Sequence, residues 1–167
     1  MNQEIERKFF LFAYPQGLLD SGELKLAGRE VIEQTYLALT ETEEIRIRRL
    51  APADGGTAHY THTYKRGHGL SRGEAEYDIS EEIYKQLLEG SGRLPLIKTR
   101  TKVLDASGRL FEIDDYHQFN LQTVEAEFAS LEEAEGFAAP VWFGEEVGSQ
   151  QEYRNKTLWR EVQGIGD

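Results

Sequence analysis

The amino-acid sequence predicts an α+β fold made mainly of antiparallel β-strands, with a few helices packed outside the sheet. Three observations support this prediction. Most segments with strand propensity alternate charged and apolar residues with a period of two, short runs rich in glycine, aspartate and serine separate them, and only brief stretches show helical spacing. Because short connections join most consecutive strands, we expect neighbouring strands to pair antiparallel.

Length and composition limit the classes of protein to consider. A chain of 167 residues with 39% hydrophobic residues can bury one core, so we expect a single domain over residues 1–167. The net charge of −11 disfavours nucleic acid or an anionic membrane as a partner. The absence of cysteine excludes disulfides, Cys-bound zinc and a thiol nucleophile. Without a signal-peptide pattern or a long apolar run, the expected state is a cytoplasmic monomer or homodimer.

The first predicted strand carries charge on one of its faces. It runs from about Glu4 to Phe12 and ends before Pro15, which cannot donate a hydrogen bond to a neighbouring strand. Because side chains alternate along a strand, Glu4, Glu6 and Lys8 share one face. The opposite face is apolar, so the strand can pack against a core on that side only.

The next part of the chain predicts helical turns, a strand and then a hairpin. Residues 16–29 predict one or two short helical turns, because glycine interrupts their leucines. Residues 31–39 predict a strand rich in β-branched and aromatic side chains. Residues 43–50 and 59–66 alternate cleanly, and the connection 51–56 contains the proline and glycines of a hairpin turn.

The middle of the chain predicts a strand, a helix and a second hairpin. Residues 74–79 alternate acidic with apolar side chains and predict a strand. Ser80 is a suitable N-cap for a helix over residues 81–89, whose first turn is acidic. Residues 97–104 and 109–116 predict strands joined by a turn of aspartate, serine and glycine.

The C-terminal part predicts one more strand and two helices. Residues 121–129 alternate acidic and apolar side chains in the manner of a strand. A capping box that begins at Ser130 predicts a short helix to about Phe137. Residues 140–144 predict a turn region, and residues 150–162 predict a terminal helix with apolar anchors.

Six of the predicted strands carry charges at positions i and i+2 on one face. Besides the first strand, the charged pairs are Arg46/Arg48, Glu74/Glu76, Lys98/Arg100, Glu112/Asp114 and Glu125/Glu127. Two architectures fit this pattern. An open sheet would leave the charged face in water, and the periodicity alone favours this architecture. A closed barrel would enclose the charges and bury its apolar exterior beneath the helices.

The grouping of the charges favours the barrel. A charge-lined cavity is stable only if the charges pair or bind a ligand, so separate acidic and basic strands indicate a polyanion together with cations. Arginine and lysine suit phosphate oxygens, and clustered carboxylates suit Mg²⁺ or Mn²⁺. The ligand that this chemistry implies is a polyphosphate bound with metal.

The same strands resemble those of a known family. Residues 4–9, Glu-Ile-Glu-Arg-Lys-Phe, match the ExExK signature that opens members of the CYTH family, also called triphosphate tunnel metalloenzymes. The similarity continues in the family's order through residues 34–37, 45–48, 64–67, 72–76, 98–100, 111–114 and 124–128. This ordered set spans most of the chain and is similar to the small bacterial tripolyphosphatase type.

The resemblance implies an eight-stranded, closed antiparallel tunnel with a charged interior, which binds triphosphate with two Mg²⁺ or Mn²⁺ ions. The implied phosphate-binding residues are Lys8, Arg46, Arg48, Lys65, Lys98 and Arg100. The implied metal carboxylates are Glu4, Glu6, Glu125 and Glu127. Four more residues would hold further metal or orient basic side chains: Glu74, Glu76, Glu112 and Asp114. The catalytic lysine–tyrosine pair of the family's hydrolases falls on Lys8 and Tyr36.

The expected reaction is metal-dependent hydrolysis of inorganic triphosphate, with nucleoside triphosphates as slower candidates. Positioning and charge neutralisation, rather than a covalent nucleophile, would promote in-line attack on a terminal phosphorus. A class IV adenylate cyclase resembles the same fold, but nothing in the sequence marks an adenine pocket. A polyphosphate-binding module without turnover is the second alternative.

Two features of the sequence stay open within this resemblance. Related hydrolases have an acidic residue before an aromatic-x-Asn-x-x-Leu segment, which is matched here by Tyr153, Asn155 and Leu158. The acid, however, is missing or displaced to Glu152, so the part played by the terminal helix stays open. Arg72 is expected either to reach phosphate or to form a loop ion pair.

Overall fold

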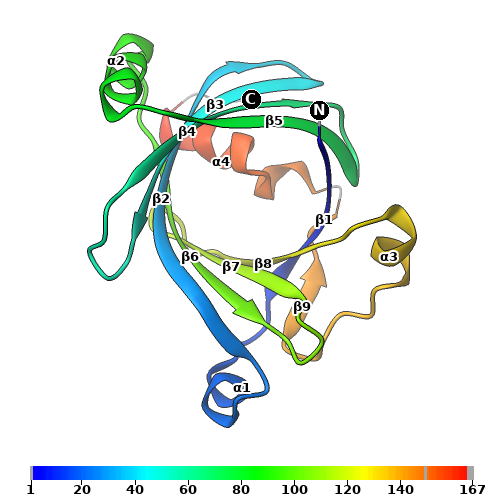
Figure 1. The fold of residues 1–167 in the computed structure, drawn as a ribbon. Coiled ribbons are helices and arrows are strands. Elements are labelled where there is room, and N and C mark those ends of the chain that lie inside the picture. The colour runs from blue at the N-terminus through cyan, green and yellow to red at the C-terminus, as the bar shows by residue number, and fades with distance from the viewer. Residues whose placement is uncertain (1, 149, 165–167) are drawn as a thin grey trace.

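A closed antiparallel β-barrel forms the body of the protein (Figure 1). The computed structural model describes residues 2–148 and 150–164. The barrel strands are β1 (Asn2–Leu11), β2 (Lys25–Leu39), β3 (Glu43–Pro52), β4 (His59–Arg66), β5 (Ser71–Ile79), β6 (Leu96–Leu104), β7 (Leu110–Tyr116) and β8 (Gln122–Glu127). They pair in the order β5-β4-β3-β2-β6-β7-β8-β1, and β1 also pairs with β5. The predicted eight-stranded barrel is therefore confirmed, and the open sheet is not formed.

Strand β1 closes the barrel because its two halves pair with different neighbours. Residues 2–5 lie antiparallel to β5, with Glu4 opposite Arg72. Residues 6–10 lie antiparallel to β8, with Lys8 opposite Glu125. The charged face that the sequence predicted for this strand is consequently the face that lines the barrel interior.

Apolar side chains cover the outer face of the barrel. Phe9, Phe111 and Val124 come from neighbouring strands and are buried in one hydrophobic cluster outside the wall. On another side, Ile47 and Tyr60 belong to a second cluster with Tyr84, whose ring centroid lies 4.9 Å from that of Tyr60. The hydrophobic core thus lies outside the strands, which leaves the interior to polar side chains.

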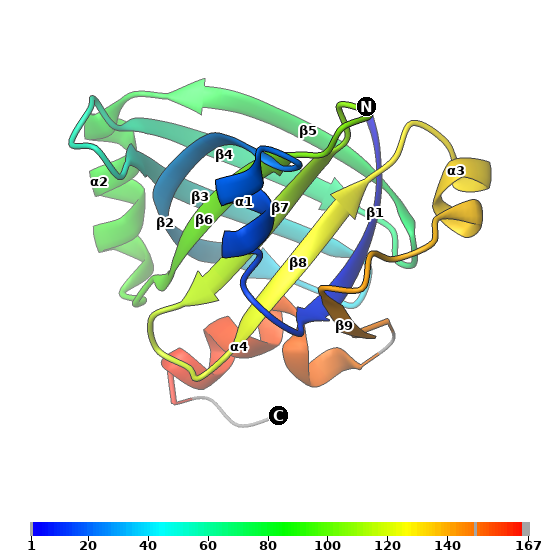
Figure 2. The ribbon, with the colours of Figure 1, turned by 90° about the horizontal axis from the view of Figure 1, so that it is seen from below.

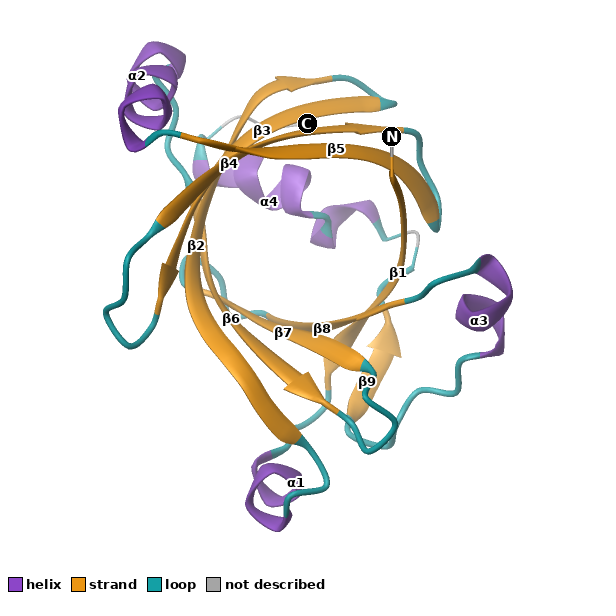
Figure 3. Ribbon diagram, in the orientation of Figure 1, coloured by secondary structure: helices purple, strands orange, loops and turns teal. Residues whose placement is uncertain are grey.

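Three helices lie outside the barrel wall: α1 (Gln16–Ser21), α2 (Glu81–Ser91) and α3 (Leu131–Gly136) (Figure 3). Both predicted N-caps are present. The Ser80 hydroxyl accepts a hydrogen bond from the Ile83 N–H group at 3.1 Å, and the Ser130 hydroxyl accepts one from the Glu133 N–H group at 3.1 Å. These bonds satisfy N–H groups that the first helical turn leaves without partners.

Strand β2 begins earlier than the sequence predicted. It starts at Lys25, so the prediction of helical turns over residues 16–29 was wrong for the second half of that segment. Pairing with β6 places Lys25 opposite Leu104, and the register shifts between Leu26 and Gly28. This irregularity accommodates the glycine that had suggested a break in the strand.

The C-terminal segment closes one end of the barrel. The helix predicted over residues 150–162 is split into two, η1 (Gln151–Tyr153) and α4 (Asn155–Val162). Seen along the barrel, α4 lies across its far opening (Figure 1), and Figure 2 shows the same helix at one end of the barrel. Leu158 and Trp159 form a buried cluster with Tyr36 and Leu96.

None of the helices in the described residues is long and apolar enough to cross a membrane.

A ninth strand, β9 (Phe143–Glu146), pairs with the end of β1. The sequence predicted a turn region over residues 140–144, and residues 141 and 142 do form a turn, but the prediction was wrong for residues 143 and 144, which begin β9. The segment is short and contains glycine, so its own strand propensity is low. Tertiary contacts hold it instead: Arg7 donates to both carboxylate oxygens of Glu146, from Nη2 to Oε1 at 2.6 Å and from Nε to Oε2 at 3.0 Å.

Gly144 allows β9 to approach β1 closely. A Cβ atom at this position would lie 2.9 Å from the carbonyl oxygen of Phe10, so the backbone would have to shift. We expect Gly144→Ala to lower the free energy of unfolding by about 1–3 kcal/mol in urea titrations. Gly136→Ala is the matched control, because a Cβ there meets nothing within 4 Å. Equal losses in both variants would contradict the argument.

Candidate active site

The barrel interior contains a cavity of about 310 Å³ lined mainly by charged side chains. Cross-strand register brings opposite charges together, with Lys8 opposite Glu125 and Arg100 opposite Asp114. Most of the residues that the sequence predicted for the site line this cavity: Glu4, Glu6, Arg46, Arg48, Lys65, Glu74, Glu76, Lys98, Arg100, Glu112, Glu125 and Glu127. The barrel therefore brings the acidic and basic strands of the prediction around one space.

A second cavity, of about 380 Å³, continues toward the end that α4 closes. Lys8 and Tyr36, the predicted catalytic pair, line this second cavity. Five residues line both cavities: Glu6, Arg46, Lys65, Glu125 and Asn155. The two spaces are thus neighbouring parts of one tunnel.

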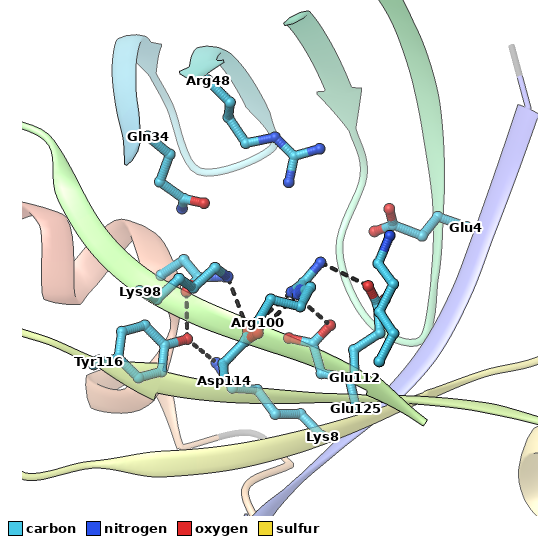
Figure 4. Close-up of polar contacts among 12 residues, drawn as sticks. Glu4, Lys8, Gln34, Arg48, Lys98, Arg100, Glu112, Asp114, Tyr116 and Glu125 are labelled. Carbon is cyan, nitrogen blue, oxygen red and sulfur yellow. Dashed lines mark hydrogen bonds and ion pairs between the residues drawn. The ribbon is translucent and has the colours of Figure 1, made fainter. Parts of the chain in front are cut away.

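Most cations in the tunnel are paired with carboxylates. The N–O distances are 2.8 Å for Lys65–Glu4, 2.9 Å for Arg100–Glu112 and 3.2 Å for Arg48–Glu76. Figure 4 shows Arg48 on the opposite wall from Lys98 and Arg100, with all three side chains directed into the interior. These pairs offset part of the cost of enclosing the charge.

The carboxylate of Asp114 binds two of the predicted phosphate-binding cations, Lys98 and Arg100. This carboxylate is fully buried and accepts hydrogen bonds from Lys98 Nζ at 2.9 Å and from Arg100 Nε at 2.7 Å. Burial opposes ionisation, but the charges of Arg100 and Lys98 hold the pKa of Asp114 well below its ordinary value. Burial lowers the pKa of Lys98 to about 8 despite the nearby charge of Asp114. Both oxygens of Asp114 are therefore occupied by cations (Figure 4).

Lys8 and Arg46 differ from the other predicted phosphate-binding residues. Within the parts of the chain that the structure describes, neither forms an ion pair with a carboxylate. The Nε atoms of Arg46 and Arg48 are buried without a hydrogen-bond partner. Buried donors without partners are rare in proteins, and both arginines line the tunnel. An anion in the tunnel would give these guanidinium groups a partner.

The carboxyl groups of the tunnel lie close enough together that they resist ionising at the same time. Burial, followed by the charges of Glu125 and Glu4, raises the pKa of Glu6 to about 8. A hydrogen bond with Glu4, together with burial, raises the pKa of Glu74 to about 7. Burial and the charge of Glu112 also raise the pKa of Glu127. Such shifts show that a bound cation would relieve repulsion among these groups.

The acidic residues fit a metal ion that binds together with its substrate. In residues 2–148 and 150–164, no group of three His, Cys, Asp or Glu side chains is arranged as a ready-made metal site. Mg²⁺ characteristically takes only one or two protein carboxylates and completes its shell with water and substrate phosphates. Glu6 and Glu125 line both cavities, beside the cations that would face a phosphate chain, and their chemistry suits this arrangement.

The two predicted catalytic residues have separate hydrogen-bond partners. Lys8 Nζ donates to the hydroxyl of Tyr116 at 3.3 Å and to the carbonyl oxygen of Tyr153 at 3.0 Å. The Tyr36 hydroxyl accepts a bond from Gln34 Nε2 at 3.3 Å, and burial followed by the charge of Glu44 raises the pKa of Tyr36. No hydrogen bond joins Lys8 to Tyr36 among the described residues.

Two more residues belong to the site, although the sequence did not assign them to it. Arg72, which the sequence left open, lines the second cavity, and its guanidinium lies 3.5 Å from Glu4 and 3.4 Å from Glu44. Tyr116 follows Glu112 and Asp114 on the same face of β7, so extending the alternation by one step would have identified it.

The interior of this closed β-barrel is lined by clustered carboxylates and by cations, most of which are paired with those carboxylates. These features define the class of protein as a charge-lined tunnel. Its sequence matches the CYTH domain over residues 2–151, and the chain belongs to the CYTH domain family. Membership in this family of triphosphate tunnel metalloenzymes implies dependence on a divalent metal.

Curated relatives and solved structures agree with this classification. The inorganic triphosphatase of Nitrosomonas europaea is 36% identical over 158 residues, covering 93% of this chain and 95% of the relative. The inorganic triphosphatase of Acetivibrio thermocellus is 28% identical over 158 residues, covering 95% and 94%. The crystal structure of the inorganic triphosphatase NE1496 has a TM-score of 0.61 at 35% identity and covers 95% of each chain. The PH1819 protein from Pyrococcus horikoshii has a TM-score of 0.59 at 20% identity, and the match covers 98% of this chain and 92% of the PH1819 chain. At this identity the match supports the fold alone.

Proposed function

We propose that this chain is a metal-dependent inorganic triphosphatase, which splits tripolyphosphate and water into pyrophosphate and phosphate inside the tunnel. The observation that carries the proposal is that Lys8 and Arg46, which form no ion pair with a carboxylate among the described residues, line the same cavity as Glu6 and Glu125. Two inorganic triphosphatases match nearly the whole chain. The tunnel therefore has both the charge and the shape for a short polyphosphate.

In this proposal the basic residues bind the phosphate chain and orient it. Arg46 and Arg48 supply Nε donors that have no hydrogen-bond partner among the described residues. Arginine can hold phosphate oxygens through two parallel bonds, whereas lysine acts as a point charge. The remaining phosphate contacts come from Lys65, Lys98 and Arg100, which their carboxylate partners hold in place. Rate acceleration would arise from positioning and from neutralising oxygen charge.

The acidic residues divide into two roles. Glu4, Glu6, Glu125 and Glu127 would hold two Mg²⁺ or Mn²⁺ ions, which supply Lewis-acid polarisation of phosphate and activation of the attacking water. Asp114, Glu112 and Glu76 accept bonds from cations, and this contact pattern favours a role in orienting those cations. Glu74 lies 3.9 Å from Lys65 and belongs with the second group, whereas Glu4, which accepts a bond from Lys65 at 2.8 Å, would serve in both roles.

A substrate panel tests the proposed function. We expect phosphate release from tripolyphosphate with Mg²⁺ or Mn²⁺, slower release from ATP, no cyclic AMP, and loss of activity on addition of EDTA. Phosphate release would be measured by a colorimetric assay and cyclic AMP by chromatography. Cyclic AMP without phosphate release would indicate the adenylate cyclase alternative. Tripolyphosphate binding without phosphate release would indicate a binding module.

A further inference from the structure

We propose that Asn155 binds a substrate phosphate through its side-chain amide, and that Tyr116 is the positioning residue that orients this amide. The proposal rests on the proposed triphosphatase function and adds a substrate contact from the segment that closes the tunnel. Asn155 is the first residue of α4 and lines both cavities. It therefore lies where the charged interior meets the closed end.

A directed chain of hydrogen bonds fixes the orientation of Asn155. Lys8 Nζ lies 3.3 Å from the Tyr116 hydroxyl, and that hydroxyl lies 2.6 Å from Asn155 Oδ1. An ammonium group can only donate, so the hydroxyl must accept from Lys8 and its own hydrogen is free to point to Asn155. The atom of Asn155 that faces Tyr116 is accordingly its oxygen, which accepts this hydrogen.

The amide nitrogen of Asn155 is left for another partner. With Oδ1 turned to Tyr116, the NH₂ group is directed away from it, and no hydrogen bond to this nitrogen is made by any of the described residues. An amide NH₂ offers two donors, which suit phosphate oxygens. Lys8 bonds to the same Tyr116 hydroxyl and has no carboxylate partner among the described residues, so the two groups present donors to the same region of the tunnel.

Tyr116 is rigid enough to act as a positioning residue. It is 2% exposed and packs in the buried cluster that contains Tyr36, Leu96 and Trp159. Lys98 Nζ also lies 5.6 Å from the centroid of its ring. Because packing fixes the ring, the hydroxyl has one location, and the hydrogen-bond chain has one geometry.

Two replacements of Asn155 separate a substrate contact from a purely structural link. Asn155→Asp keeps an oxygen that accepts from Tyr116 but replaces the NH₂ donors by a negatively charged acceptor. We expect kcat/KM for tripolyphosphate to fall about fivefold in Asn155→Ala and further in Asn155→Asp, with the melting temperature of Asn155→Asp retained. A structural link alone predicts the opposite order, because aspartate preserves the bond to Tyr116. Wild-type kcat/KM in Asn155→Asp would overturn the proposal.

Thr157→Asp controls for added charge, because it places a carboxylate on the same helix at a residue that lines neither cavity. We expect kcat/KM of this variant to stay within about twofold of wild type. A loss as large as that of Asn155→Asp would show that the added negative charge lowers kcat/KM, and it would overturn the proposed contact between Asn155 and phosphate. If the wild-type protein releases no phosphate from tripolyphosphate, the proposed function itself fails.

The positioning role of Tyr116 has its own test. Tyr116→Phe removes the hydroxyl and keeps the packed ring, and we expect kcat/KM to fall about fivefold in the wild-type background. In the Asn155→Ala background the same change should cost about twofold, because one of the two groups that the hydroxyl orients is already gone. Equal factors in both backgrounds would show that Tyr116 does not act through Asn155. Tyr77→Phe is the control, because it removes a hydroxyl group from an exposed tyrosine on β5.

Discussion

Lys8→Ala is expected to lower kcat/KM for tripolyphosphate by about 100- to 1000-fold while the fold is retained. The Lys8 ammonium has two neutral hydrogen-bond partners, Tyr116 and Tyr153, and no paired carboxylate among the described residues. Its charge and its third donor are therefore available to a phosphate oxygen. Phosphate release would measure the loss, and circular dichroism with thermal melting would show whether the barrel is intact.

Lys85→Ala is the matched control for this prediction. Lys85 lies on the exposed surface of α2, where its Nζ is 2.8 Å from Glu81 Oε1 in an i,i+4 pair. Exposed pairs of this kind contribute little to stability, so activity and melting temperature should both stay near wild type. Near-normal turnover in Lys8→Ala, or an equal loss in Lys85→Ala, would refute the role assigned to Lys8.

The pattern of charges predicted the strands but could not decide between an open sheet and a closed barrel. Alternation places Glu4, Glu6 and Lys8 on one face whether that face meets water or a cavity. Closure depends on β1, whose first half pairs with β5 and whose second half pairs with β8. Such pairings join segments that lie far apart in the chain, so local periodicity does not contain them. The grouping of charges and the family resemblance supplied what periodicity lacked.

The errors in the fold prediction occurred where tertiary contacts override local propensity. Gly28 suggested a break, yet β2 continues through it because β6 supplies the hydrogen-bond partners and an irregular register absorbs the glycine. The segment of β9 lacks strand propensity, yet Arg7 and the edge of β1 hold it in place. In both places a neighbouring strand determines the structure, and the sequence of the segment itself does not.

Site residues could be predicted as a set, but their mutual contacts could not. Alternation was sufficient to place the charged side chains on one face of the strands, and closure of the barrel makes that face one interior. The bond of Lys8 to Tyr116 depends on the pairing of β1, β8 and β7, and its bond to Tyr153 depends on where the C-terminal segment lies. The same holds for Asn155, whose orientation follows from a hydrogen-bond chain across three elements.

Asp114→Ala is expected to destabilise the protein by about 3–5 kcal/mol, the largest stability effect predicted for a single residue. The Asp114 carboxylate is 0% exposed and accepts bonds from Lys98 Nζ and Arg100 Nε at 2.9 and 2.7 Å. Lys98 is itself 1% exposed, so removing Asp114 leaves this buried ammonium without its carboxylate partner. Urea unfolding of both proteins would measure the difference.

Asp115→Ala separates this effect from a general loss of charge on β7. Asp115 is the next residue along the strand, faces outward and is exposed, so its replacement should change the free energy of unfolding by less than about 0.5 kcal/mol. The double variant Asp114→Ala/Lys98→Met removes the buried ammonium as well, and it should be more stable than Asp114→Ala alone. If the double variant is instead less stable than Asp114→Ala, the cost comes from the lost volume, and the unpaired cation is not its cause.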